Sequence, residues 1–177
     1  MSEEVVLDFI ESARREFLRY KQLGAKSIEV LTEEELNADP TGANSVGIIV
    51  KHLHGNMRSR WINLFTSDGE KPDRDRDSEF ESSHLSKEEL LRLYNEGWSF
   101  VESALSAITP QDVSSPVVIR SESLTLVQAV ERQLTHYAYH VGQIVYAAKQ
   151  FRGQEWKSLS IPKRRSAEHI QGTYRKI

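Results

Sequence analysis

The sequence predicts an all-α protein, organised as a four-helix bundle with a long crossover between the second and third helices. Two observations support this prediction. Apolar residues recur at i, i+3 and i+4 spacing over four stretches of about 20 residues, which is the period of amphipathic helices. One short, one long and one medium connection join these stretches, and the long connection allows the two helices beside it to run parallel.

The first predicted helix begins at Ser2 and ends near Leu23-Gly24, because glycine commonly follows the last residue of a helix. Its apolar residues follow a helical spacing: Val5, Val6, Phe9, Ile10, Ala13, Phe17 and Tyr20. A short helical turn should follow, because Thr32 and Glu35 can form a capping box. Residues 37–42 are predicted to be a loop.

The second predicted helix begins after Asn44, its expected N-cap, and runs to about Phe65. One stripe of this helix is apolar: Val46, Ile49, Val50, Leu53, Met57, Trp61 and Leu64. Residues 66–83 are polar and charged and contain too few apolar side chains to pack. They are predicted to form the long surface crossover, whose position makes it a candidate lid or dimer contact.

Two further helices complete the predicted bundle. A capping box at Ser86 opens the third helix, which stops at Thr109-Pro110. The β-branched run 117–119 and the polar residues after it predict a small hairpin. Another capping box at Thr125 opens the fourth helix, which continues to about Arg152-Gly153. The tail beyond it is mixed and basic, and a short terminal helix could form there.

Length and composition favour one soluble, cytoplasmic domain over residues 1–177. The formal net charge of −3 argues against a nucleic-acid binder, which would carry a basic surplus. The sequence has no cysteine, which excludes disulfides, thiolate metal sites and cysteine nucleophiles. The acidic N-terminal segment lacks the features of a signal peptide, and the longest apolar run, VGIIV, is too short to span a membrane.

Three of the six histidines are candidate metal ligands: His52, His136 and His140. His136 and His140 lie four residues apart, so both imidazoles project from one face of a helix and can reach the same ion. In the second helix, His52 shares a polar strip with Asn56 and other small polar residues beside the apolar stripe, as expected for the wall of a wet pocket.

The same pattern has an ordinary structural interpretation. A histidine on the flank of a helix is more often exposed or hydrogen-bonded than bound to a metal. His54 projects away from His52 and is the weaker ligand candidate, and no function is assigned to His84 or His169. Tyr137 occupies the position of the glutamate in H-E-x-x-H, so the zinc-protease interpretation is excluded because its general base is missing.

Two helical segments resemble the metal motifs of the DinB-like (YfiT-like) superfamily. They are IVKHLHGNMRSRW at residues 49–61 and LTHYAYHVGQI at residues 134–144. Together with DGEKPDRDRD at residues 68–77, they are most similar to a bacterial subfamily that lacks an assigned function. The resemblance implies a four-helix bundle with a long crossover and a three-histidine metal site. By position, the ligands would be His52, His136 and His140.

The superfamily includes metal-dependent S-transferases and isomerases that use low-molecular-weight thiols, so the resemblance implies a small-molecule substrate such as a thiol. Three imidazoles suit Zn, Ni, Fe or Mn and leave positions open for water or substrate. Asn56, Arg60 and Gln143 are candidate substrate-binding residues, with an ordinary salt bridge as the competing role for Arg60. The alternatives are a non-catalytic or stress-related metal-binding protein, a purely structural bundle and a metal-dependent hydrolase. A homodimer is expected.

Overall fold

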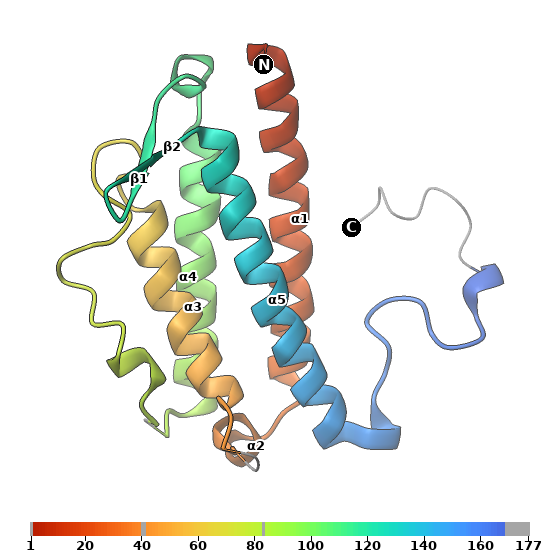
Figure 1. Ribbon diagram of the computed structural model, residues 1–177. Helices are drawn as coiled ribbons and strands as arrows, with labels where there is room; N and C mark the ends of the chain where they lie inside the picture. Colours follow the sequence, from red (N-terminus) through yellow and green to blue (C-terminus); the bar gives the residue numbers. More distant parts are fainter. Residues whose placement is uncertain (1, 40–41, 83, 169–177) are drawn as a thin grey trace.

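The structure is a computed structural model that describes residues 2–39, 42–82 and 84–168. Over these residues the fold is mainly α, with five α-helices and one small two-stranded sheet, which confirms the predicted class. Figure 1 shows the long helices side by side. In this view α1 and α5 run downward and α3 and α4 run upward, so the helices on either side of the crossover are parallel, as predicted. Their bounds are α1 Glu3–Glu29, α3 Val46–Trp61, α4 Lys87–Ala107 and α5 Leu126–Arg152.

The long helices pack mainly as two pairs, α1 with α5 and α3 with α4, and the core lies between the pairs. Large aromatic side chains fill it. Trp98 and Tyr137 are both fully buried, and the ring of Phe17 lies 5.7 Å from Trp61 and 5.9 Å from Tyr137. Because Tyr137 lies on the same helix as His136 and His140, the core directly supports the candidate site.

The helix starts follow the predicted capping signals closely. Thr32 opens the short helix α2 (Glu33–Asn37) with a complete capping box, and Ser86 and Thr125 do the same for α4 and α5. At α1, Ser2 accepts a hydrogen bond from the backbone of Val5. The prediction is wrong by one residue at α3, where Ser45 rather than Asn44 is the N-cap. Each cap satisfies a backbone N–H that the helix leaves without a partner.

The predicted end of α1 at Leu23-Gly24 is wrong, because the helix continues to Glu29. Gly24 is buried inside it, and a Cβ atom there would lie 2.0 Å from the hydroxyl oxygen of Tyr94. That hydroxyl donates a hydrogen bond of 3.0 Å to the carbonyl of Lys21. This glycine therefore allows α4 to approach α1 closely and does not terminate the helix.

The second predicted helix ends earlier than expected, at Trp61 rather than Phe65. Ile62 is extended, with ψ at 127°, and Asn63 has a positive φ of 54°, a region that asparagine tolerates better than most residues. The crossover therefore begins at residue 62. It runs down the outside of α3 and contains one 3₁₀ helix, Ser78–Phe80, before α4 begins.

The predicted hairpin is present as strands β1 (Val117–Ile119) and β2 (Glu122–Leu124), paired antiparallel. Its two turn residues, Arg120 and Ser121, have φ values of 54° and 62°, as a tight two-residue turn requires. Their backbone N–H groups both donate to the carboxylate of Asp68, at 2.8 and 2.7 Å. The hairpin and the start of the crossover are therefore held together.

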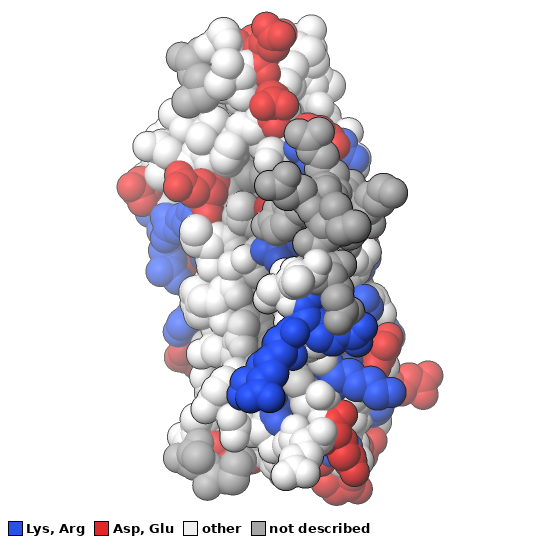
Figure 2. Space-filling view, turned by 90° about the vertical axis from the view of Figure 1, so that its right-hand side faces the viewer, with Lys and Arg blue, Asp and Glu red and all other residues white. Residues whose placement is uncertain are grey.

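After α5 the described chain forms 3₁₀ turns at Gly153–Glu155 and Ser166–Glu168 rather than a terminal α-helix. This segment is basic, with Lys157, Lys163, Arg164 and Arg165. Figure 2 shows the face beside α1 and α5, where basic side chains gather in the lower half. His169 lies outside the described residues. None of the described helices combines the length and apolar character needed to cross a membrane.

Candidate metal centre

The three predicted ligands come together where α3 faces α5. Each of His52, His136 and His140 offers one nitrogen, and these nitrogens all lie within 4.8 Å of one another. Nε2 of His52 lies 3.3 Å from Nε2 of His136. His52 and His140 are only 5% and 7% exposed, so the cluster lies inside the protein. The three histidines are close enough to hold one metal ion.

Two nitrogens of this cluster can carry lone pairs for an ion, one of them the Nε2 atom of His52 that lies 3.3 Å from Nε2 of His136. If Nδ1 of His52 donates to Glu79 and Nδ1 of His140 donates to Gln143, the Nε2 atoms of both rings carry lone pairs. The Nε2 atom of His140 is buried and has no hydrogen-bond partner among the described residues. A buried polar atom without a partner is costly, and a metal ion would remove that cost. The donor set therefore fits a divalent ion.

Glu79 fixes the orientation of His52 from the crossover. Its Oε2 atom accepts a hydrogen bond of 2.9 Å from Nδ1 of His52, and both of its oxygens accept hydrogen bonds from Arg74, at 2.8 and 2.9 Å. Glu79 is buried, and Gly55 leaves the space it occupies, since a Cβ atom there would lie 2.1 Å from Oε1. A carboxylate behind a ligating imidazole is the usual way in which proteins orient a metal ligand.

Burial keeps two of the three histidines, His136 and His140, neutral. Burial, with smaller contributions from His140 and His52, lowers the pKa of His136 to about 3. Burial also lowers the pKa of His140 to about 4, against the opposing hydrogen bond to Gln143. For Glu79, burial acts to raise the pKa, but the hydrogen bonds from His52 and Arg74 outweigh it and lower the pKa. Neutral imidazoles beside an ionised carboxylate are the protonation states that metal ligation needs.

The histidines open into a cavity of about 470 Å³. Asn56, Gln133 and Tyr139 line it next to them, and the rest of the described lining is rich in arginine. No aspartate or glutamate belongs to the described lining. A cavity of this size can admit a small molecule to the histidine cluster.

A family model described as "Protein of unknown function (DUF1572)" matches residues 4–165, which include all three histidines. The chain belongs to this family. No curated protein and no solved structure gives a significant match. The description of the DUF1572 family assigns no function, so the site has to be interpreted from its own geometry.

The three predicted substrate-binding residues occupy different positions in this DUF1572 protein. Asn56 lines the cavity and accepts a hydrogen bond of 3.0 Å from the Tyr137 hydroxyl. Arg60 also lines the cavity, but its guanidinium donates to the carbonyl of Gly69 and pairs with Glu70. Gln143 is not part of the described lining and instead accepts the hydrogen bond from His140. Gln143 is therefore placed to orient a histidine.

The other two described histidines, His54 and His84, lie outside the cluster. His54 faces α4, where Nε2 lies 3.4 Å from a carboxylate oxygen of Glu96. His84 is exposed in the connection before α4.

Two residues that support the site, Glu79 and Arg74, are not indicated by the sequence pattern. The sequence contains a glutamate in the charged crossover and a glycine, Gly55, on α3. Neither residue on its own predicts that the two meet in the fold.

Proposed function

We propose that this DUF1572 protein binds one divalent metal ion, Zn, Ni, Fe or Mn, through His52, His136 and His140. The observation that carries the proposal is the set of three converging nitrogens, two of which keep lone pairs inside the protein. Glu79 and Gln143 support it, because each holds one imidazole in the tautomer that ligation requires.

The arrangement of the chain supports placing it among the DinB-like (YfiT-like) proteins, as a single-domain four-helix bundle. Four long helices lie side by side, a long crossover joins α3 to α4, and one histidine on α3 faces two on α5. This is the arrangement expected from the resemblance between the sequence motifs.

The reaction we propose is the transfer of a small thiol to an electrophilic carbon. A divalent ion held here would lower the pKa of a coordinated thiol or water toward neutrality. The S–H proton would pass to solvent, a sulfur–carbon bond would form, and the leaving group would depart with its electron pair. The absence of a carboxylate from the described lining favours a substrate that brings its own nucleophile over a hydrolase that needs a base.

Elemental analysis of the untagged protein tests the metal site. Wild type should carry close to one equivalent of metal, and the His136→Ala/His140→Ala variant should carry almost none. His54→Ala is the matched control, because it removes an imidazole of α3 that faces Glu96 instead of the cluster. Loss of metal from the control, or equal metal in all three proteins, would refute the assignment.

Turnover assays test the reaction separately. Metal-loaded wild type should consume thiol in the presence of electrophiles, and the double histidine variant should not. If metal is bound at one equivalent and no thiol is consumed, the protein is a metal-binding protein without this activity.

A further inference from the structure

The cavity beside the histidines is strongly basic, although the chain as a whole carries a net charge of −3. Five arginines from four separate segments line it: Arg60 from α3, Arg74 and Arg76 from the crossover, Arg120 from the hairpin and Arg132 from α5. The carboxylates that pair with these arginines are those of Glu70, Glu79 and Glu122. Three carboxylates against five guanidinium groups leave a surplus of positive charge.

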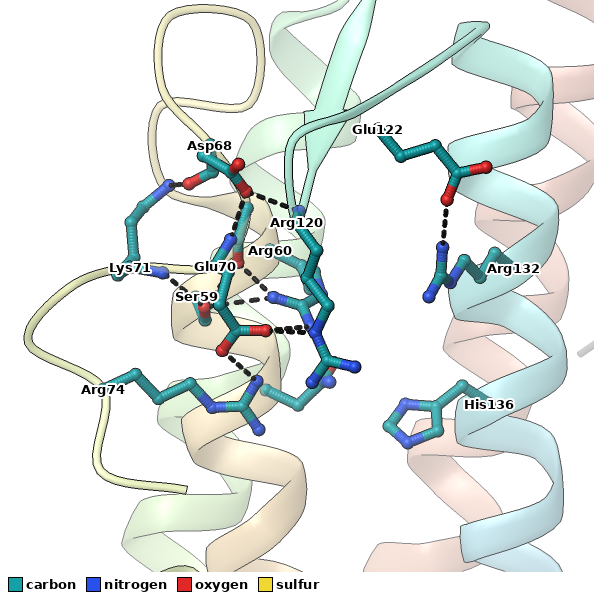
Figure 3. Close-up of polar contacts among 12 residues, drawn as sticks. Ser59, Arg60, Asp68, Glu70, Lys71, Arg74, Arg120, Glu122, Arg132 and His136 are labelled. Carbon is teal, nitrogen blue, oxygen red and sulfur yellow. Dashed lines mark hydrogen bonds and ion pairs between the residues drawn. The ribbon is translucent and has the colours of Figure 1, made fainter. Parts of the chain in front are cut away.

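Two of the five arginines hold the wall together. The side chain of Arg60 is 6% exposed and bonds to the Gly69 carbonyl, Ser59 and Glu70. Arg74 makes a two-point contact with Glu79, and Glu70 lies close to both arginines. Figure 3 shows Glu70 between Arg60, Arg74 and Arg120, on the side of the cavity opposite α5. These ion pairs fix the crossover against α3.

Even within this wall, one donor has no acceptor. The side chain of Arg74 is 3% exposed, and its Nη1 atom makes no hydrogen bond with any described residue. Its closest carboxylate oxygen, on Glu70, lies at 3.5 Å as an ion-pair contact. A buried guanidinium nitrogen without an acceptor favours a ligand that would supply one.

The other three arginines keep most of their donors for the cavity. Arg120, 55% exposed, uses only Nε in its bond to Glu70, and no bond from its two terminal nitrogens to a described residue is seen. Within the described chain, the ion pair of Arg132 is with Glu122 at 3.6 Å, which is too long for a hydrogen bond. Arg76 lies over the Phe80 ring at 4.9 Å and forms no ion pair with a described residue.

The placement of Arg132 connects this charge to the histidines. It precedes His136 by four residues on α5, so the two side chains project from the same face one turn apart. Figure 3 shows both side chains directed across the cavity toward Arg60 and Arg120. A molecule reaching the histidines from this side would therefore pass between guanidinium groups.

We infer that this arginine ring, residues Arg60, Arg74, Arg76, Arg120 and Arg132, binds the carboxylate or phosphate group of a small anionic substrate whose other end meets the histidines. The inference rests on the proposed function, because it names the substrate class of the same site. Planar guanidinium groups bind both kinds of oxyanion through paired N–H donors. The cavity volume of about 470 Å³ suits a small molecule.

Calorimetric titration tests the ring with succinate and with glycerol 3-phosphate, each beside its uncharged counterpart, succinamide and glycerol. Both anions, or one of them, should bind wild type at least tenfold more tightly than the uncharged partner. The Arg120→Gln/Arg132→Gln variant should lose at least tenfold of that affinity. Binding of only one anion would still support the ring and would identify the group as carboxylate or phosphate.

The control variant is Arg15→Gln/Arg92→Gln, which removes the same charge from two exposed arginines, 61% and 65% exposed, outside the cavity. It should stay within twofold of wild type. Circular dichroism establishes that each variant is folded, and the single Arg132→Gln variant repeats the test with the least disturbance. Equal losses in control and ring variants, or no preference for anions over uncharged partners, would overturn the inference. Binding of an acidic peptide or single-stranded DNA without either small anion would overturn it as well.

Metal content measured on the same samples separates this inference from the proposed function. The ring variant should keep its metal, because neither substituted residue forms a hydrogen bond or ion pair with a histidine of the cluster among the described residues. Arginine-dependent anion binding by a protein that carries no metal would refute the metal site and leave the ring standing. Normal metal content without anion preference would refute the ring alone.

Discussion

The helices and the crossover build the same cavity in different ways. α5 supplies His136 and His140, whose common direction follows from the helical repeat, and α3 supplies His52 from the facing helix. The crossover, residues 62–86, supplies Glu79, which lies 27 residues from His52 along the chain and orients it through a tertiary contact. The pairing of His136 with His140 and the orientation of His140 by Gln143 are therefore encoded locally, whereas the orientation of His52 depends on a distant part of the chain.

Adding metal should change stability most, because a bound ion would hold the histidines of α3 and α5 together and act through Glu79 on the crossover. A ligand that binds only the folded state stabilises it by about 2.7 kcal/mol when its free concentration is 100 times its Kd. Thermal unfolding of metal-free protein with and without zinc or nickel measures this gain. The His136→Ala/His140→Ala variant should show no such gain, and a similar gain in that variant would place the binding site elsewhere.

Removing the charge that the crossover supplies should have the next largest effect. Glu79→Gln keeps the size of the side chain but weakens its hold on His52, so metal affinity should fall about 10- to 100-fold. Competition with a chelator measures the change. Glu81→Gln, an exposed neighbour in the same segment, should bind metal like wild type. Equal affinities in wild type and Glu79→Gln would mean that the crossover does not tune the ligands.

A substitution in the helical core should lower the free energy of unfolding. Tyr137 accepts a hydrogen bond of 2.9 Å from Nε1 of Trp61 and donates one of 3.0 Å to Asn56. Tyr137→Phe leaves both buried partners unsatisfied and should cost about 1–3 kcal/mol of unfolding free energy. Denaturant titration measures it. An unchanged midpoint would show that this network contributes little to the core.

The smallest effects should come from substitutions of two helical glycines, one that faces the crossover and one that does not. Gly55→Ala places a methyl group against Glu79 and should weaken metal binding by displacing the crossover. Gly142→Ala on α5 meets nothing within 4 Å and should stabilise the protein by about 0.5–1 kcal/mol, as alanine normally does in a helix. Chelator competition and denaturant titration on both variants test the pair. Stabilisation by Gly55→Ala with unchanged metal affinity would contradict the close contact.

The sequence was sufficient for the features that depend on short-range spacing. The capping boxes located most helix starts, and the H-x-x-x-H pair with His52 identified the cluster. The sequence was insufficient where the role of a residue is a contact with another residue that is distant in the chain. Gly24 was predicted to end the first helix because glycine often follows a helix. Its actual role, a close contact with Tyr94, depends on the packing of α4 on α1 and cannot be predicted from the local sequence.

The sequence also could not predict the hydrogen-bond partners of the candidate site residues. Arg60 and Gln143 were predicted to be substrate-binding residues from their proximity to the histidine motifs. The structure adds the partners of these side chains, Glu70 for Arg60 and His140 for Gln143, while Arg60 still lines the cavity. The charged crossover was predicted to be a solvated loop, yet Glu79 and the Arg74 side chain are buried. Charge composition alone cannot distinguish a solvated loop from one whose charges pair against a helix.

The turn H-Y-A-Y-H has a consequence for any attempt to redesign this pocket. Two residues of the histidine cluster, His136 and His140, flank Tyr137, which is fully buried among the core aromatics. Any repacking that rotates Tyr137 would rotate α5 about its axis and carry both imidazoles with it. An engineer who wants a different metal preference therefore has more freedom on the crossover side, where Glu79 and Gly55 can be varied while the packing around Tyr137 is kept.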